Sequence, residues 1–244
     1  MIGIIFFGIL GWAAGAAIWI IARAQADKRG FLTGPVCDAC GAALPDTAWV
    51  PFYGFGSVSE CPSCHARQGF LRPLFELGTA AYFAAAAAVI DDKTRLVAAI
   101  CFSVPLLIIL LVDAWTRFIY TNVIGLGLAL GLLFAAADGI WDLGKSIIGI
   151  LVGLGIFVGF FLLARVLYRS VKVVPFGLGD VYLAAMIGAM VRFPLVLSSL
   201  ILGIVLAGIA GMALLLAKRA SRKQVIPYGP YLCAGALVVI LTRF

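Results

Sequence analysis

The feature that most constrains the fold of this sequence is a series of long apolar runs separated by shorter polar connections. The runs lie at about residues 2–22, 73–90, 96–112, 119–137, 146–164, 173–191, 195–217 and 226–242. Each holds about 17 to 24 residues, enough to cross a hydrocarbon core of roughly 30 Å as an α-helix. With 64% hydrophobic and 12% charged residues, the chain lacks the polar surface of a water-soluble globule. The sequence therefore predicts an all-α, polytopic transmembrane bundle of about eight helices.

The basic residues are divided unevenly between the two sides of such a bundle. One set of alternate connections holds thirteen of the 18 Lys and Arg residues: Arg23, Lys28, Arg29, Arg67, Arg72, Arg117, Arg165, Arg169, Lys172, Lys218, Arg219, Arg222 and Lys223. The other set holds Lys93, Arg95, Lys145, Arg192 and Arg243. Because cytoplasmic connections carry the excess of basic residues, the first set predicts the cytoplasmic side and leaves both termini outside. The net charge of +7 is then a property of topology, and we expect no nucleic-acid partner.

The first apolar run has no basic residues before it, which favours a retained first helix over a cleaved signal peptide. We therefore expect a multi-pass membrane protein, surrounded by lipid. Its domains would be a first transmembrane helix at 1–22, a cytoplasmic loop at 23–72 and a seven-helix membrane domain at 73–244. Glycines four residues apart predict close helix contacts within the bundle: Gly11/Gly15, Gly127/Gly131, Gly149/Gly153 and Gly155/Gly159. The sequence carries no signal for an oligomeric state.

The polar loop contains two pairs of cysteines with the spacing of a metal site. Cys37 and Cys40 form one CxxC pair, and Cys61 and Cys64 form the second. Two such pairs complete a tetrahedral zinc site of four thiolates, which is closed and therefore structural. A redox dithiol pair is the alternative, whereas a stable disulfide does not fit a reducing cytoplasm. His65 is interpreted as a surface residue, since four cysteines already suffice.

Three of the eleven acidic residues lie at or within apolar runs: Glu76, Asp113 and Asp180. Ionisable groups are costly there and are candidates for function. The topology places Asp113 and Asp180 at the cytoplasmic ends of their helices, so they form a candidate catalytic pair. Gly177 and Gly179 leave space beside Asp180 for an extended peptide to approach.

Two carboxyl groups that share a site can share one proton, which suits acid–base catalysis. The ionised group can activate water, while its protonated partner polarises a scissile carbonyl. Spacing alone leaves structural interpretations open, because Asp113 could pair with Arg117 and Asp180 could cap a helix. A transporter or assembly factor with ion-binding acids is a further alternative, although such acids are expected near the midplane of the membrane.

The combined motifs resemble the type IV prepilin peptidase family. The cysteine pairs are followed by the stretch Arg72–Glu76, which is similar to the family sequence that enters its second helix. Asp113 matches the first catalytic aspartate, and the string at Gly177–Asp180 matches the GxGD motif with the second. The string at Pro227–Tyr231 resembles the family's C-terminal pattern. Other GxGD membrane proteases, of the presenilin kind, lack the cysteine loop and are the runner-up.

The resemblance implies a membrane aspartyl endopeptidase that removes the basic leader of prepilins or pseudopilins on the cytoplasmic side. It also implies that such proteins often N-methylate the new N-terminus with S-adenosylmethionine. Glu76 is expected to shape the site or to contact the leader. The chain departs from the family pattern at Tyr120-Thr121, where Pro-Asn or Pro-Asp is usual, and at Tyr182, where Lys is usual. A degenerate, non-proteolytic member of the family is therefore also an alternative.

Overall fold

The computed structural model describes residues 2–29, 33–37, 39–51, 60–66, 69–167, 177–217 and 227–243. The helices are α1 (Ile2–Ala26), the 3₁₀ helix η1 (Asp46–Trp49), α2 (Leu71–Val89), α3 (Lys93–Thr116), α4 (Thr121–Asp138), α5 (Ile140–Leu167), α6 (Leu178–Val191), α7 (Leu195–Leu216) and α8 (Gly229–Arg243). The all-α prediction is confirmed, because each of the eight predicted runs overlaps one of the α-helices in the described part.

Five of these helices are long and apolar enough to cross a membrane: α1, α3, α4, α5 and α7. α6 and α8 are also apolar but have only 14 and 15 residues. The first residues of the predicted sixth and eighth runs, 173–176 and 226, lie outside the described residues. Seven of the thirteen basic residues assigned to the cytoplasmic side lie outside them too: Arg67, Arg169, Lys172, Lys218, Arg219, Arg222 and Lys223.

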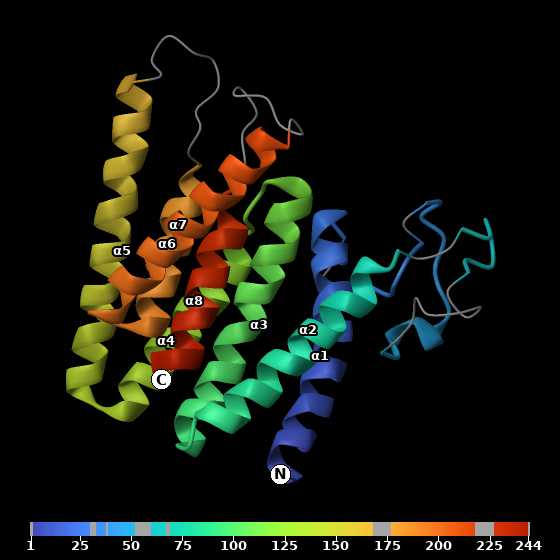
Figure 1. Cartoon of the computed structure of the whole chain (residues 1–244), viewed down its shortest axis with the longest axis horizontal. Coiled ribbons are helices and arrows are strands. Elements are labelled where there is room, and N and C mark those ends of the chain that lie inside the picture. The colour runs from blue at the N-terminus through green and yellow to red at the C-terminus, as the bar shows by residue number, and fades with distance from the viewer. Residues whose placement is uncertain are drawn as a thin grey trace. The chain divides into compact units, whose positions relative to one another are not determined.

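The chain forms two compact units, Met1–Ile100 and Cys101–Phe244, and α3 runs from one into the other. In the first unit, α1 and α2 lie side by side (Figure 1). Two glycines of α1 allow this contact. A Cβ added to Gly11 would lie 2.7 Å from the Cβ of Phe83, and one added to Gly15 would lie 3.0 Å from the Cα of Glu76.

In the second unit α6 is the central helix, in contact with α4, α5, α7 and α8 (Figure 1). All residues from Val181 to Val191 except Tyr182 are buried. The backbones of α5 and α6 meet directly, since an added Cβ at Gly149 or Gly153 would collide with carbonyl oxygens of Gly188 and Ala184. Such contacts bring the two helices close enough for van der Waals packing along their backbones.

The other two predicted glycine pairs differ in whether they contact a neighbouring helix. Gly127 and Gly131 of α4 pack against Met186 and Ala189 of α6. Gly155 and Gly159, by contrast, have no heavy atom of the described residues within 4 Å of an added Cβ. Three of the four pairs thus serve intramolecular packing, and the fourth does not contact a described neighbour.

An ion-pair cluster joins the ends of α4, α5 and α6. Arg192 follows α6 with a positive φ of 64° and pairs with Asp138 of α4 and, at 3.4 Å, with Asp142 of α5. The next backbone N–H, that of Phe193, donates to the carbonyl of Lys145 over 3.0 Å. This cluster lies at the opposite end of α6 from Asp180 and fixes the helix ends there.

Candidate active site

Asp113 lies in the last turn of α3 and is almost completely buried, with 4% of its surface exposed. Its Oδ2 atom is inaccessible to solvent and has no hydrogen-bond partner in the described part of the chain. Arg117, the partner expected from a structural role, is exposed and contributes an electrostatic attraction. Arg117 has a positive φ of 58°, and its backbone N–H donates to the carbonyl oxygen of Asp113 over 2.9 Å. The carboxyl group of Asp113 is therefore buried with unused hydrogen-bonding capacity, which is unusual for a purely structural residue.

Asp180 is the third residue of α6, and the glycines before it determine how it is held. The Gly177 N–H donates to Asp180 Oδ2 over 3.2 Å, and the Asp180 N–H donates to the Gly177 carbonyl over 3.2 Å. Gly179 lies against Ile119, whose Cβ would be 3.1 Å from a Cβ added to the glycine. The carboxylate therefore caps its own helix, and the second glycine allows α6 to approach the connection after α3.

The carboxyl groups of Asp113 and Asp180 are close enough to interact electrostatically. Both also interact with the thiol of Cys233, which is completely buried in α8. Gly229, one turn earlier in α8, lies against Asp113, with 2.5 Å between an added Cβ and Oδ2. Three segments that are far apart in sequence thus meet at the two aspartates.

Gly229 and Cys233 are site residues that the sequence interpretation missed. Cys233 is completely buried and interacts electrostatically with both aspartates. Their spacing of four residues places them on one face of α8, and this was the signal available in the sequence. Three residues depart from the family pattern. Tyr120 precedes α4, Thr121 begins α4, and Tyr182 is 45% exposed on α6.

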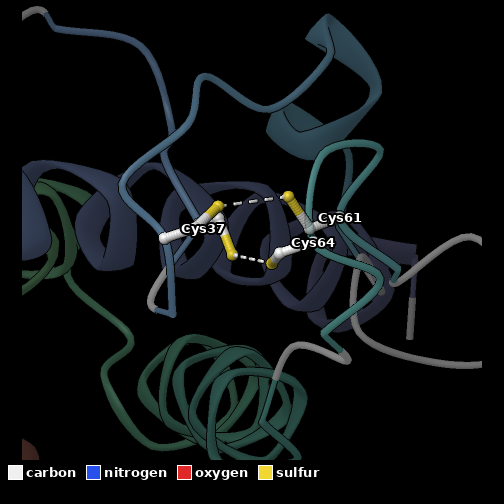
Figure 2. Close-up of side chains that lie close together, drawn as sticks. Cys37, Cys61 and Cys64 are labelled. Carbon is white, nitrogen blue, oxygen red and sulfur yellow. Dashed lines mark hydrogen bonds between the residues drawn. The ribbon is translucent and has the colours of Figure 1, made fainter.

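The four predicted cysteines form a cluster able to hold a metal ion, with all four sulfur atoms within 4.8 Å of one another (Figure 2). The Sγ atoms of Cys37 and Cys64 are 3.7 Å apart, as are those of Cys40 and Cys61. A tetrahedral zinc ion with Zn–S bonds of about 2.3 Å requires sulfur atoms about 3.8 Å apart. The donor set therefore fits zinc.

The two cysteine pairs sit in turns with the same hydrogen bonds. The Cys37 N–H donates to the Ala42 carbonyl over 2.9 Å, and the Cys61 N–H donates to the Ala66 carbonyl over 3.0 Å. The residue after each second cysteine has a positive φ, 73° at Gly41 and 55° at His65. His65 is exposed and is not among the ligands of the cluster, as the sequence interpretation expected.

Backbone N–H groups in the second turn favour a thiolate. The N–H of Cys64, followed by that of Ser63, lowers the pKa of Cys61 to about 6. Cys37 and Cys61 are buried, while Cys40 and Cys64 are exposed. The turn thus favours the deprotonated form of Cys61, the form that a metal ligand needs.

Glu76 lies completely buried in α2 and accepts a hydrogen bond from Arg72 Nε over 2.9 Å. A second nitrogen of the same guanidinium donates to the carbonyl of Ala48, in η1, over 2.7 Å. Ala48 packs with Cys37 and Cys61 in the small apolar cluster of the loop. Glu76 therefore fixes the arginine that ties the cysteine loop to α2.

Comparison with known proteins gives three findings. Residues 99–212 match the type IV leader peptidase family. Over 206 residues the chain is 26% identical to a prepilin leader peptidase/N-methyltransferase of Bacillus subtilis (strain 168), covering 84% of this chain and 80% of the relative. Over 203 residues it is 26% identical to one of Aeromonas hydrophila, covering 81% and 66%. No solved structure gives a significant match.

The matched region contains both aspartates that meet in the second unit, and the longer alignments cover more than four fifths of the chain. The membrane-type helices and the metal-capable cysteine cluster agree with this assignment. The chain therefore resembles the type IV leader peptidase family, over residues 99–212 and in the longer alignments with the two relatives.

Proposed function

We propose that the chain is a membrane aspartyl endopeptidase that removes the basic leader of type IV prepilins or pseudopilins at the cytoplasmic face. The observation that carries the proposal is the meeting of Asp113 and Asp180 in one unit, with their carboxyl groups in electrostatic contact. Oδ2 of Asp113 is buried without a hydrogen-bond partner among the described residues, so it keeps the hydrogen-bonding capacity that a catalytic carboxyl group needs. The two relatives that carry the name of a leader peptidase support the same reaction.

The chemistry follows from a proton shared by the two carboxyl groups. One carboxylate accepts a proton from water as the water oxygen attacks the scissile carbonyl. The protonated partner donates to the carbonyl oxygen, which gives a neutral tetrahedral intermediate. When the C–N bond breaks, the amine leaves with a proton from the pair, and the shared proton is restored. The pair acts as one unit, so neither role is assigned to a single residue.

The position of the pair supports a substrate held as a membrane helix. Asp113 lies near the end of α3, and Asp180 near the start of α6. The scissile bond of a leader that emerges from an apolar helix would reach this level of the bundle. Leu178, in the GxGD motif, is 54% exposed, so the motif is accessible from one side.

The cysteine loop is proposed to hold one structural zinc ion through Cys37, Cys40, Cys61 and Cys64. When bound, the ion supplies folding free energy to the loop and leaves no open coordination position for catalysis. Glu76 is proposed to shape this region through Arg72. The names of the relatives support N-methylation with S-adenosylmethionine as a second activity.

The proposal is tested with purified protein, a prepilin in detergent, and mass spectrometry of the product. Asp113→Asn and Asp180→Asn should each reduce cleavage on the order of 10²–10⁴-fold, the contribution typical of a catalytic acid or base. Asn at 180 can still accept the hydrogen bond from Gly177, so this substitution separates catalysis from helix capping.

Asp142→Asn is the matched control, because it removes a carboxylate from the same unit at the ion-pair cluster of Arg192. It should cleave normally. Wild-type rates in either site variant would refute the aspartate pair. A product whose mass exceeds that of the cleaved pilin by one methyl group, only when S-adenosylmethionine is present, would demonstrate the second activity.

A further inference from the structure

The start of α8 lies against the buried carboxyl group of Asp113. A Cβ added to Gly229 would be 2.5 Å from Oδ2, 3.0 Å from Cγ and 3.3 Å from Cβ of Asp113. Real Cβ atoms essentially never approach heavy atoms within 3.0 Å. Only glycine fits here without displacing the carboxyl group.

Among the described residues, the Gly229 N–H is the donor of this helix start that interacts with Asp113. The N–H groups of Tyr231 and Leu232 both donate to the Tyr228 carbonyl over 3.1 Å, and Pro230 has no N–H. The Gly229 N–H interacts with the carboxyl group of Asp113, but Oδ2 still lacks a full hydrogen bond. The glycine thus contacts the carboxyl group on the side of Oδ2.

α8 cannot retreat to make room for a side chain at this position. On its other face Gly235 lies against α7, with 2.6 Å between an added Cβ and the Ser199 carbonyl oxygen. Gly203 of α7 lies equally close to Leu232, at 2.8 Å from its Cα. A methyl group at 229 would therefore move the Asp113 side chain rather than the helix.

We infer that Gly229 is a positioning residue for Asp113: its missing side chain lets the first turn of α8 pack against the carboxyl group and hold it in its buried position. The inference rests on the proposed function for its catalytic consequence but has a structural consequence of its own. If the contact holds the carboxyl group, shortening Asp113 must relieve the cost of a side chain at 229. This coupling is specific to the pair, because residues in contact show non-additive effects on stability.

The experiment is a double-mutant cycle of thermal unfolding in detergent, with Gly229→Ala and Asp113→Ala. Gly229→Ala should lower Tm by at least about 2–4 °C, the shift that corresponds to roughly 1 kcal/mol in a protein of this size. In the Asp113→Ala background the same substitution should lower Tm by less than half as much. Gly235→Ala is the matched control, because it introduces an equally close contact without an aspartate and should lower Tm equally in both backgrounds.

Equal losses for Gly229→Ala in the two backgrounds would overturn the inference. If Gly229→Ala alone does not accumulate, the double variant decides: its recovery supports the contact, and its absence refutes it. In the cleavage assay, Gly229→Ala should lower kcat at least tenfold and leave KM within twofold, whereas unchanged kcat would contradict the positioning role. A wild-type protein that fails to cleave would refute the proposed function, while the unfolding cycle would still test the contact.

Discussion

Asp180 serves two purposes with one side chain, since it caps the start of α6 and its carboxyl group interacts with that of Asp113. A helix cap was the structural alternative to catalysis for this residue, and the geometry makes the two compatible. A short side chain that is hydrogen-bonded to the nearby backbone can adopt few rotamers. Capping therefore also restricts the position of the carboxyl group. Precise placement of this kind is what acid–base catalysis requires.

His65 is a second residue whose backbone conformation can be tested by substitution. It has φ 55° at the position where the other cysteine turn has Gly41. A left-handed conformation costs an ordinary residue roughly 1–2 kcal/mol, whereas glycine adopts it freely. His65→Gly should therefore bind zinc at least as firmly as the wild type, and His65→Val should bind it less firmly.

The measurement is the chelator concentration at which half of the zinc is released from purified protein. Gly41→Val is the control in the other turn and should weaken retention in the same direction as His65→Val. Loss of zinc from His65→Gly would show that the imidazole is a ligand and would contradict the four-cysteine site. The comparison separates backbone strain from metal ligation.

At the scale of helices, the packing of α5 on α6 depends on which glycines face the neighbour. Gly153 faces the backbone of Ala184, whereas Gly155, two residues later, has no heavy atom within 4 Å among the described residues. We predict that Gly153→Ala lowers Tm in detergent. Gly155→Ala should leave Tm unchanged or raise it, because alanine is favoured over glycine in a helix by up to about 1 kcal/mol.

The pair is matched in helix, residue type and depth, so a shared effect on Tm would mean that helix propensity, not backbone contact, controls stability. Thermal unfolding followed by circular dichroism distinguishes the two. A loss at Gly155 alone would indicate that this side of α5 packs against something outside the described residues.

The sequence predicted the helices well because apolar length is a local property, but it predicted their ends less well. The fifth run was expected to begin at 146, yet α5 begins at Ile140. Its first turn contains Asp142 and Lys145, whose charges interrupt the apolar pattern, and ion pairing at the ends of α4 and α6 supports the helix there.

For the site, the cysteines and both aspartates were identified because charges and thiols in an apolar chain are conspicuous. Gly229 was not, since its contribution is an absent side chain next to a residue more than a hundred positions away. The hydrogen bond from Arg72 to the Ala48 carbonyl could not be predicted from the sequence either, because it depends on how the loop folds back on α2. Contacts of this kind leave no periodic trace in the sequence.

At the scale of the whole molecule, the proposed topology puts the 90–95 connection outside and the 117–120 connection in the cytoplasm. In intact cells a membrane-impermeant maleimide should label Asp92→Cys but not Arg117→Cys, and permeabilisation should expose the second. Both positions are exposed on the protein surface, so burial does not protect either of them. Reaction is measured as the mass added to the protein.

The unsubstituted chain is the control for its native cysteines, of which Cys40 and Cys64 are exposed. Those two lie in the loop assigned to the cytoplasm and should react only after permeabilisation. Labelling of Arg117→Cys in intact cells would invert the topology and would move the aspartates to the opposite face.

The two short helices at the aspartates have a consequence for the surrounding bilayer. Helices of 14 and 15 residues, α6 and α8, extend roughly 21 and 22 Å at 1.5 Å per residue. A bilayer has a hydrocarbon core of about 30 Å, so the two helices fall short of its full thickness. Over the described residues, such a shortfall would thin the membrane or draw headgroups and water inward. Under the proposed function, the water consumed by hydrolysis would then arrive from a local depression in the lipid rather than through a channel in the protein.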